Sequence, residues 1–347
     1  MATDSLAFLD AVEGLPEQLA AAHAAAAAIP ADAFPSAEGL TNIVVCGMGG
    51  SGISGDVLSA ATNDRLRLPV TVLKQIRIPA FVGPNSLVFA MSYSGGTEET
   101  VSMARAAVEA GARLVCVSKG GALGELAAQA GALHIPCPDG YLPRAAVGTL
   151  VAPLFVTLHR MGLLDSGLDD LTSAQQQLAR RRDVCARAVD APRNVAKELA
   201  RKIGRTFPLV YGGGALGQVA AYRWKCDVNE NAKAPSYWAA YPELDHNEIC
   251  AWGQAGDVTR QLISLVELRH GFEHEQLDRR FSYTREIIEE AVHQVLEVRA
   301  DGDSRLAQLL DLMYLGDWVS CYMALDNDVD PGPIEAIFRL KDRMAQG

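Results

Sequence analysis

Short apolar runs alternate with amphipathic segments through the first 140 residues. Continuous apolar runs of four to seven residues predict buried strands, and apolar residues that recur every three or four positions predict helices. The expected strands cover residues 41–47, 69–74, 86–92, 112–118 and 132–138, and the expected helices cover 51–63, 97–111 and 122–131. Apolar strands that alternate with helices predict a parallel sheet covered on both faces.

The same alternation returns in the second half of the chain. A long helical stretch is expected over about 150–203. Apolar segments follow at 207–214, 261–270 and 292–300, and helices are expected at 216–232, 275–291, 304–327 and 333–345. VVCGMGGSG, from Val44, and LVYGGGALG, from Leu209, resemble each other and indicate a duplicated domain. We therefore expect an α/β protein of two doubly wound parallel-sheet α/β/α sandwich domains, over residues 1–150 and 151–347.

Composition and charge narrow the classes of partner. A chain of 347 residues is long enough for two domains with separate cores. The formal net charge of -11 argues against a nucleic acid or an anionic membrane as partner, because both require clustered Lys and Arg. No apolar segment approaches the length of a membrane span, the N-terminus lacks the basic start of a secretory signal, and the seven scattered cysteines suggest reduced thiols. A cytoplasmic protein is expected.

The stretch VVCGMGGSGISGD, residues 44–56, joins an expected strand to an expected helix through glycines. Backbone N–H groups at such a helix start bind phosphate, and Ser51 adds a hydroxyl donor beside Gly50. The same stretch also has the G-x-G-x-x-G spacing of dinucleotide-binding turns. A dinucleotide requires an acidic residue after the second strand, where this chain has Lys74 and Gln75. A phosphate is therefore favoured over a dinucleotide.

A second polar turn, SYSGGTEET, follows the third expected strand. Thr97 is suited to cap the next helix, so a well-capped turn that binds nothing is the alternative interpretation. However, the turn has more hydroxyl groups than a cap requires, and a parallel sheet places both turns at the carboxyl edge of its strands. The residues that we predict to bind one terminal phosphate are Gly50, Ser51, Ser92, Ser94 and Thr97.

These two turns resemble the signature loops of sugar-isomerase (SIS) domains, which bind phosphosugars. The likeness extends to PRAAVG at 143–148, NENAK at 229–233, PELDHNEI at 242–249 and DPGPIEAIFRLK at 330–341. In this order, over nearly the full chain, the motifs resemble the bifunctional phosphoglucose/phosphomannose isomerase family. The resemblance implies two SIS domains, a phosphosugar as the small-molecule partner and no cofactor. It also implies metal-independent conversion of glucose 6-phosphate or mannose 6-phosphate to fructose 6-phosphate through an enediol.

Such an isomerisation needs three kinds of group at the reacting carbons. A base moves a proton between C1 and C2, an acid or base assists ring opening, and a cation stabilises the developing oxyanion. The resemblance assigns these roles to Glu230, His246 and Arg144, and places Lys341 near the sugar hydroxyls. In the family the histidine comes from the neighbouring subunit, which implies a homodimer that shares His246. Without the resemblance, Glu230, His246 and Lys341 would each be interpreted as ordinary surface residues.

A metal-dependent reaction is the alternative mechanism. His270 and His274 have i, i+4 spacing, with Glu273 between them, but Gly271 interrupts any helix and no third ligand is evident. We therefore expect surface histidines and no metal.

Three residues depart from the family pattern, and a second class of function remains open. Ala145, Thr149 and Gly332 replace residues that are usual in the family. They are expected to enlarge or loosen the sugar pocket and to affect the choice between glucose and mannose epimers. The alternative function is a non-catalytic regulator that binds sugar phosphates. Such regulators usually carry a DNA-binding domain, and no basic helical module precedes residue 41.

Overall fold

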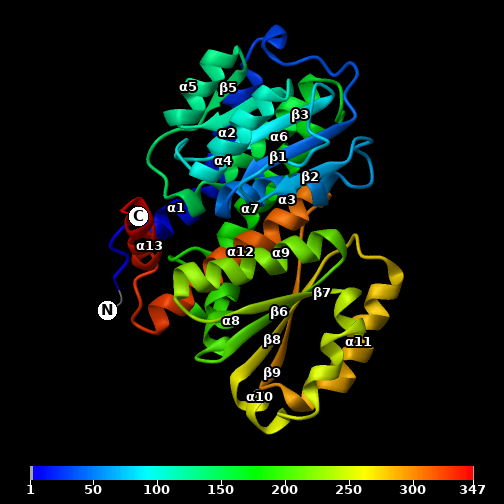
Figure 1. Cartoon of the computed structure of the whole chain (residues 1–347). Helices are drawn as coiled ribbons and strands as arrows, with labels where there is room; N and C mark the ends of the chain where they lie inside the picture. The colour runs from blue at the N-terminus through cyan, green and yellow to red at the C-terminus, as the bar shows by residue number, and fades with distance from the viewer. Residues whose placement is uncertain (1–2, 347) are drawn as a thin grey trace. The chain divides into compact units, whose positions relative to one another are not determined.

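The computed structural model describes residues 3–346, and the chain divides into two compact units (Figure 1). Unit 1 comprises Met1–Glu13, Arg180–Ala300 and Leu312–Gly347, and unit 2 comprises Gly14–Ala179 and Asp301–Asp311. These units differ from the division at residue 150 that the sequence suggested. The reason is α6 (Val147–Arg160), a largely buried helix that packs against α2 (Leu15–Ala27) and α3 (Gly49–Thr62) and so belongs with the first sheet.

Unit 2 is built on a five-stranded parallel sheet with the order β2-β1-β3-β4-β5. The strands are β1 (Asn42–Gly47), β2 (Val70–Leu73), β3 (Ser86–Met91), β4 (Arg113–Ser118) and β5 (Leu133–Pro136). All five expected strands are confirmed. The central strands β1, β3 and β4 are buried along almost their whole length, which explains why they are apolar at consecutive positions rather than at alternating ones.

Helices cover both faces of this sheet. The chain passes from β1 to β2 in one direction and from β3 through β4 to β5 in the other, so right-handed crossovers put α3 on one face and α4 (Glu98–Glu109) and α5 (Gly121–Ala130) on the opposite face. Side chains of β1, β3 and β4 form one apolar core with α4 and α5, which includes Val88, Ala104 and Leu123.

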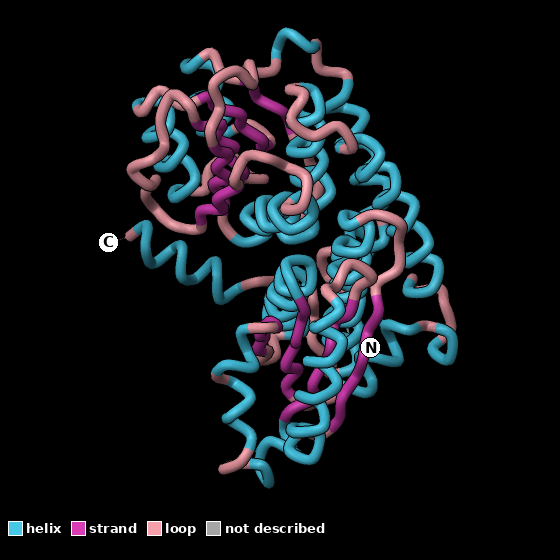
Figure 2. The backbone as a smooth tube through the Cα atoms, turned by 90° about the vertical axis from the view of Figure 1, so that its right-hand side faces the viewer, coloured by secondary structure: helices cyan, strands magenta, loops and turns pink. Residues whose placement is uncertain are grey.

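Unit 1 repeats this arrangement with four parallel strands in the order β7-β6-β8-β9, which corresponds to β2-β1-β3-β4. Figure 2 shows the strands of the chain, in magenta, with helices beside them. The strands are β6 (Phe207–Gly213), β7 (Tyr237–Tyr241), β8 (Ile263–Arg269) and β9 (Gln294–Arg299). The helices that follow β6 and β8 are α9 (Gly214–Asp227) and α11 (Glu275–Ile288). The equivalent strand order confirms the expected pair of parallel-sheet α/β domains, although β7 was not predicted.

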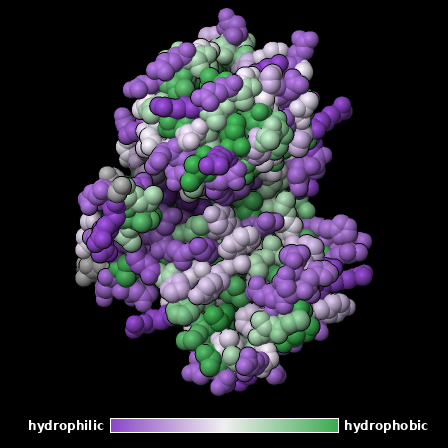
Figure 3. Space-filling view, in the orientation of Figure 1, coloured by the Kyte–Doolittle hydropathy of each residue, from purple (hydrophilic) through white to green (hydrophobic). Residues whose placement is uncertain are grey.

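Some helices differ from the sequence-based expectation. The stretch over 150–203 is not continuous: α6, α7 (Gly167–Cys185) and α8 (Val195–Ile203) are separated by turns. The remaining helices are α1 (Phe8–Glu13), α10 (Gly256–Leu262), α12 (Arg305–Asp326) and α13 (Glu335–Ala345). Among the residues that the structure describes, no helix is long and apolar enough to cross a membrane. In the view of Figure 3, hydrophilic residues predominate on the surface, with smaller apolar areas between them.

Candidate functional site

The two polar turns that were expected to bind phosphate lie side by side in unit 2. β1 and β3 are adjacent parallel strands, and Gly47 lies opposite Met91 in their register, so the two turns begin at the same level of the sheet. The backbone N–H of Tyr93, in the second turn, donates a hydrogen bond of 3.2 Å to Ser51 Oγ, at the start of α3. Both turns therefore meet at the carboxyl edge of the sheet, as the parallel topology predicted.

The hydroxyl groups of the second turn form a hydrogen-bonded cluster. Ser92 Oγ lies 2.8 Å from Thr97 Oγ1 and 3.4 Å from Ser94 Oγ, and it accepts a hydrogen bond of 3.1 Å from the Gly95 backbone N–H. Thr97 occupies the N-cap position of α4, but its hydroxyl bonds to Ser92 rather than to the first turn of the helix. Its hydroxyl is thus part of the cluster that we expect to face a phosphate, and it does not serve as a simple helix cap.

The loop that follows β4 contacts the second polar turn, residues 92–100, through backbone atoms. Gly95 has a φ of +74°, and a side-chain carbon at this position would collide with the carbonyl oxygen of Gly120. The Leu123 N–H donates to Gly95 O at 3.0 Å, and the Lys119 N–H donates to Tyr93 O at 3.0 Å. The second turn is therefore held by backbone contacts on its inner side, and only glycine suits position 95.

Arg144 lies beside the glycine turn, as the sequence suggested. It belongs to the short 3-10 helix Pro143–Ala145, and its residue is only 4% exposed. A side-chain carbon on Gly50 would lie 3.1 Å from Pro143 O and 3.3 Å from Arg144 Cα, so the two backbones are in close contact. This segment therefore brings Arg144, whose guanidinium is charged at all ordinary pH values, to the glycine turn at the edge of the first sheet.

The end of β2 has no acidic residue for a ribose. Lys74 follows the last residue of the strand, Leu73, and forms an ion pair with Asp56 of α3. Burial raises the pKa of Asp56, while the hydrogen bond and charge of Lys74 act in the opposite direction. This observation agrees with the sequence argument against a dinucleotide.

Two of the residues that depart from the family pattern lie in the core of unit 2. Ala145 and Thr149 are buried, and Gln18 of α2 bonds to both ends of this segment. Its Nε2 donates to Ala145 O at 2.9 Å, and its Oε1 accepts from the Gly148 N–H at 2.6 Å. The third, Gly332, is buried in unit 1, where a side-chain carbon would lie 2.9 Å from Leu6 Cβ. Ala145, Thr149 and Gly332 are therefore all buried residues.

Glu230 lies on a π-helical turn, Val228–Ala232, that ends α9 in unit 1. The residue is half-buried and lines a pocket of about 440 Å³. Polar side chains of Lys233, Asp330 and Arg339 line the same pocket, together with the apolar residues Val329, Ile334 and Ile337. A carboxylate is thus presented to a cavity with both charged and apolar walls, which is the setting in which proteins place ligands.

Lys233 fixes the turn that carries Glu230. Its φ is +55°, and its ammonium donates to the carbonyl oxygens of Glu230, Asn231 and Pro331 at 2.8, 3.3 and 3.1 Å. The Asn231 side chain in turn donates to Ser320 Oγ of α12 at 2.9 Å. The turn is therefore tied both to the segment around Pro331 and to a buried helix.

A buried group of charges lies one turn before Glu230. Arg223 contacts Asp227 at 2.9 Å and Asp317 at 2.8 Å. Burial raises the pKa of Asp227 well above its usual range, and the Arg223 charge opposes this effect. Burial alone would lower the pKa of Arg223, but the two carboxylates raise it, and the negative charge of Glu230 adds to their effect.

Lys341 is not among the residues that line the Glu230 pocket. It is exposed on α13, which contributes Glu335, Ile337 and Arg339 to that pocket instead. α13 therefore lies beside Glu230, but Lys341 does not line the Glu230 pocket.

His246 is exposed at the end of a short 3-10 helix, Glu243–His246, and acidic residues on both sides of it are anchored. Asp245 accepts hydrogen bonds from Arg280 Nη1 at 2.7 Å and from Thr284 Oγ1 at 2.8 Å, both on α11. Glu248 accepts a hydrogen bond from the Tyr211 hydroxyl of β6. Burial raises the pKa of Glu248, and the Tyr211 hydrogen bond opposes the shift. These contacts fix the backbone that presents His246.

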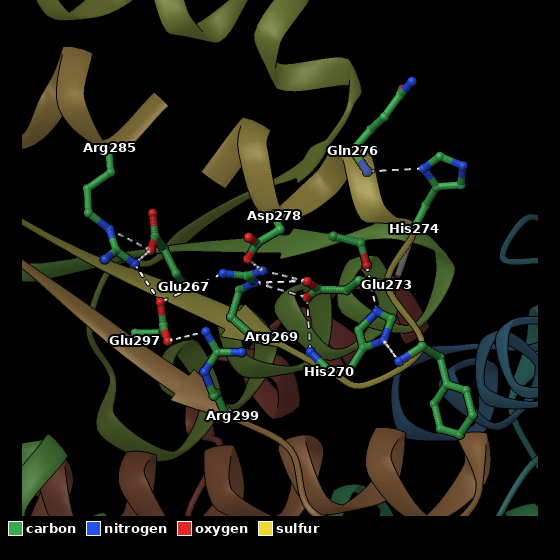
Figure 4. Close-up of polar contacts among 12 residues, drawn as sticks. Glu267, Arg269, His270, Glu273, His274, Gln276, Asp278, Arg285, Glu297 and Arg299 are labelled. Atoms are coloured by element: carbon green, nitrogen blue, oxygen red, sulfur yellow. Dashed lines mark hydrogen bonds and ion pairs between the residues drawn. The ribbon is translucent and has the colours of Figure 1, made fainter. Parts of the chain in front are cut away.

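His270 is buried, and our expectation of a surface residue is wrong for it. Figure 4 shows it at the end of β8, where its Nε2 lies 2.9 Å from Gly213 O and its Nδ1 accepts from the Phe272 N–H at 3.2 Å. Nε2 therefore carries the proton. His274 is exposed, as expected, and its Nδ1 caps α11 by accepting from the Gln276 N–H at 3.2 Å. Within residues 3–346, no group of three or more His, Cys, Asp or Glu side chains is arranged to hold a metal.

The second glycine turn, after β6, is filled by side chains of α11. A side-chain carbon on Gly213 would lie 2.9 Å from the Phe281 ring and 3.2 Å from Leu277. Arg269 lies 4.1 Å from the Phe281 ring centre and is ion-paired to Glu273 and Asp278, each at 2.8 Å (Figure 4). This edge of the second sheet is therefore occupied by packed and paired side chains.

Sequence reasoning missed three side chains that hold these sites. Tyr93, Lys233 and Glu248 each lie inside a motif that was recognised, namely SYSGGTEET, NENAK and PELDHNEI. Their positions within those motifs were the only available signal, because each acts through contacts with distant segments.

Known proteins resemble this chain in both sequence and structure. Residues 192–344 match the family model described as the bacterial phospho-glucose isomerase C-terminal SIS domain. The bifunctional phosphoglucose/phosphomannose isomerase of Caldicellulosiruptor bescii is 34% identical over 337 residues, which are 97% of this chain and 98% of the relative. The protein of the same name from Aquifex aeolicus is 32% identical over 87% of this chain and 90% of its own. A solved structure of a putative phosphosugar isomerase from Clostridium difficile shares the fold, with a TM-score of 0.70, 14% identity and 98% of each chain covered.

Proposed function

The chain belongs to the bifunctional phosphoglucose/phosphomannose isomerase family and is a phosphosugar isomerase, and we propose that it converts glucose 6-phosphate and mannose 6-phosphate to fructose 6-phosphate without a metal. The observation that carries the proposal is the gathering of the Ser51 hydroxyl, the Ser92–Thr97 cluster and Arg144 at one sheet edge. A cytoplasmic location is part of the same proposal. All seven cysteines are free thiols, five of them buried, which suits a reducing compartment.

The phosphate would be held by neutral donors. Gly50 and Ser51 lie at the start of α3, and Ser92, Ser94 and Thr97 lie at the start of α4, so both positive helix ends favour a terminal phosphate. The bond from the Tyr93 N–H to Ser51 Oγ, which joins the two turns, supports a single phosphate position rather than two.

The proton transfer would be performed by Glu230. In the open-chain aldose, the carboxylate takes the proton from C2, the electron pair forms the C1–C2 enediolate, and the same proton returns to C1 while one proton moves from O2 to O1. Arg144 would stabilise the negative charge on the enediolate oxygen. The half-buried carboxylate in its pocket supports this role for Glu230. A position for Lys341 near the sugar hydroxyls stays a prediction.

Ring opening would use His246 from a second copy of the chain. A proton moves from the O1 hydroxyl to a base, and another is delivered to the ring oxygen as the C1–O5 bond breaks. His246 is exposed between two anchored carboxylates, which supports its presentation to a neighbouring subunit. The proposed enzyme is therefore a homodimer with shared sites.

The reaction is tested with purified protein and fructose 6-phosphate, with and without a chelator, by measuring glucose 6-phosphate and mannose 6-phosphate. Turnover that the chelator leaves unchanged is expected. Glu230→Gln should abolish turnover while phosphosugar binding remains, and Glu286→Gln, on the exposed face of α11, is the matched control that should have no effect. Binding without turnover by the unaltered chain would favour the non-catalytic regulator, and loss of activity with chelator would favour a metal-dependent enzyme.

The shared site is tested by mixing two inactive variants. Glu230→Gln and His246→Ala should each lack activity alone. After dissociation and reassociation, half of the dimers are mixed and each has one intact site, so about a quarter of the original activity should return. Mixtures that stay inactive, although a tagged variant co-purifies with the untagged one, would show that His246 acts within its own chain.

A further inference from the structure

We propose that Tyr93 is a positioning residue whose hydroxyl holds Arg144 in place beside the phosphate-binding turns. The inference rests on the proposed function, because it assigns Tyr93 a task in the isomerase site. Tyr93 lies between Ser92 and Ser94 in the second turn, but its side chain turns inward and the residue is only 3% exposed. It is therefore unavailable to the substrate and can act only through other residues.

The Tyr93 hydroxyl joins two points of the segment that leads to Arg144. It donates to Pro138 O at 2.9 Å, and it accepts from the Tyr141 N–H at 2.9 Å. A hydroxyl can serve one acceptor and one donor at once, so this single group joins the two backbone positions. Burial raises the pKa of Tyr93, so the hydroxyl keeps the proton that it donates.

The segment held in this way has little regular structure of its own. It runs from the end of β5, at Pro136, to the short 3-10 helix Pro143–Ala145. It is also held by the bond from the Cys137 N–H to Ser118 O, at 2.9 Å, by an ion pair between Asp139 and Lys119, and, at its far end, by the bond from Gln18 Nε2 to Ala145 O. Because Arg144 follows Tyr141 by only three residues and its backbone lies against Gly50, a shift of this segment would move Arg144 relative to the glycine turn.

The backbone of the same residue holds the phosphate turns. The Tyr93 N–H donates to Ser51 Oγ at 3.2 Å, and Tyr93 O accepts from the Lys119 N–H at 3.0 Å. Tyr93 therefore couples the two phosphate turns through its main chain and the arginine segment through its side chain. A change of Tyr93 to Phe removes only the second coupling, because the backbone bonds and the ring contact with Lys119, 5.6 Å from the ring centre, can remain.

The test compares Tyr93→Phe with Tyr322→Phe in the full-length enzyme. Tyr322 is also buried, and its hydroxyl also donates to a backbone carbonyl, Cys185 O at 2.6 Å, so the two variants should lose similar thermal stability. Tyr93→Phe should lower kcat for fructose 6-phosphate by about tenfold, as small displacements of charge-stabilising groups do. The inhibition constant of inorganic phosphate should stay within about twofold, since the phosphate turns keep their bonds. Tyr322→Phe should change neither value.

The double variant with Arg144→Lys separates positioning from general weakening. If Tyr93 acts through Arg144, Tyr93→Phe should reduce kcat much less in the Arg144→Lys background than in the unaltered enzyme. Equal reductions in both backgrounds, or an increase of the phosphate inhibition constant that parallels the loss of kcat, would overturn the inference.

Amide hydrogen exchange of residues 138–145 provides a readout that does not depend on turnover. Exchange in this segment should accelerate in Tyr93→Phe, including at the Tyr141 amide that loses its acceptor, and should not accelerate in Tyr322→Phe. Unchanged exchange would overturn the positioning role. An unaltered chain without isomerase activity would instead overturn the proposed function, while accelerated exchange in Tyr93→Phe would still establish the structural link.

Discussion

The Tyr211 hydroxyl donates a hydrogen bond of 2.5 Å to Glu248 Oε1. Tyr211 is fully buried on β6, and Glu248 lies two residues after His246, so this bond joins the centre of the second sheet to the segment that presents the proposed ring-opening histidine. The Tyr211–Glu248 bond and the contacts of Asp245 with α11 together hold the backbone on both sides of His246.

The Glu248 carboxyl gives the stability of the protein a defined pH dependence. Its pKa in the folded state is raised above the ordinary value of 4.5, chiefly by burial. The contribution of Glu248 to the free energy of unfolding is therefore fully present below pH 4.5 and decreases as pH rises through the folded-state pKa. Glu248→Gln cannot ionise, so the stability of the unaltered protein relative to this variant should decline between pH 4 and 7 in urea unfolding. A difference that increases with pH would contradict this expectation.

Arg280→Gln should slow the reaction without affecting phosphate affinity. Removal of the guanidinium frees one side of Asp245 and loosens the backbone at His246, and we expect kcat to fall by about tenfold. Arg279→Gln is the matched control, because Arg279 is the exposed neighbour on the same helix. Steady-state kinetics with fructose 6-phosphate measure both variants. Equal kcat values for the two would show that the Asp245 contact does not position the histidine.

Gly95→Ala should disrupt the phosphate-binding turn, whereas Gly96→Ala should be tolerated. A residue other than glycine at a φ of +74° is strained by about 1–2 kcal/mol, and the added carbon would also collide with Gly120 O. No atom lies within 4 Å of the equivalent carbon at Gly96. We expect Gly95→Ala to lower the melting temperature and to weaken inhibition by inorganic phosphate by at least about tenfold. Similar behaviour of the two variants would remove the support for this turn as the phosphate site.

Lys233→Gly should reduce kcat although it suits the local backbone. Glycine readily adopts the φ of +55° found at this position, so any loss must come from the missing ammonium and its three carbonyl contacts. The turn that carries Glu230 would then be less constrained, and we expect kcat to decrease by about tenfold with little change in phosphate inhibition. The comparison variant is Lys341→Ala, because Lys225→Gly would place a glycine inside α9. Lys341 does not line the pocket, so a smaller effect than that of Lys233→Gly is expected.

The meeting of the two polar turns at one edge of the first sheet could be predicted, because it follows from the order of strands along the chain. Strands 41–47 and 86–92 were recognised as apolar runs that end in polar turns, and neighbouring parallel strands must end at the same edge. The pairing of Ser51 with Tyr93 then requires only that β1 and β3 be adjacent.

Other features depend on contacts between distant residues and could not be predicted. The strand Tyr237–Tyr241 is short and follows the π-helical turn, so its sequence resembled a loop, although the duplicated domain requires a strand there. His270 precedes a glycine in a charged segment, but it is buried, and its Nε2 bonds to Gly213, 57 residues away, a contact that its local sequence does not reveal. The breaks between α6, α7 and α8 were obscured because all three segments have helical patterns.

The packing of Phe281 and Leu277 against the second glycine turn has a consequence for ligand stoichiometry. Both domains share the strand order of their central strands, and we propose that the glycine turn of the first binds the anion, whereas the second carries Glu230 and His246. Calorimetric titration should therefore saturate at one phosphosugar per chain. In the proposed enzyme, duplication has divided the roles between the copies: one domain binds the phosphate and supplies Arg144, and the other supplies Glu230 and His246.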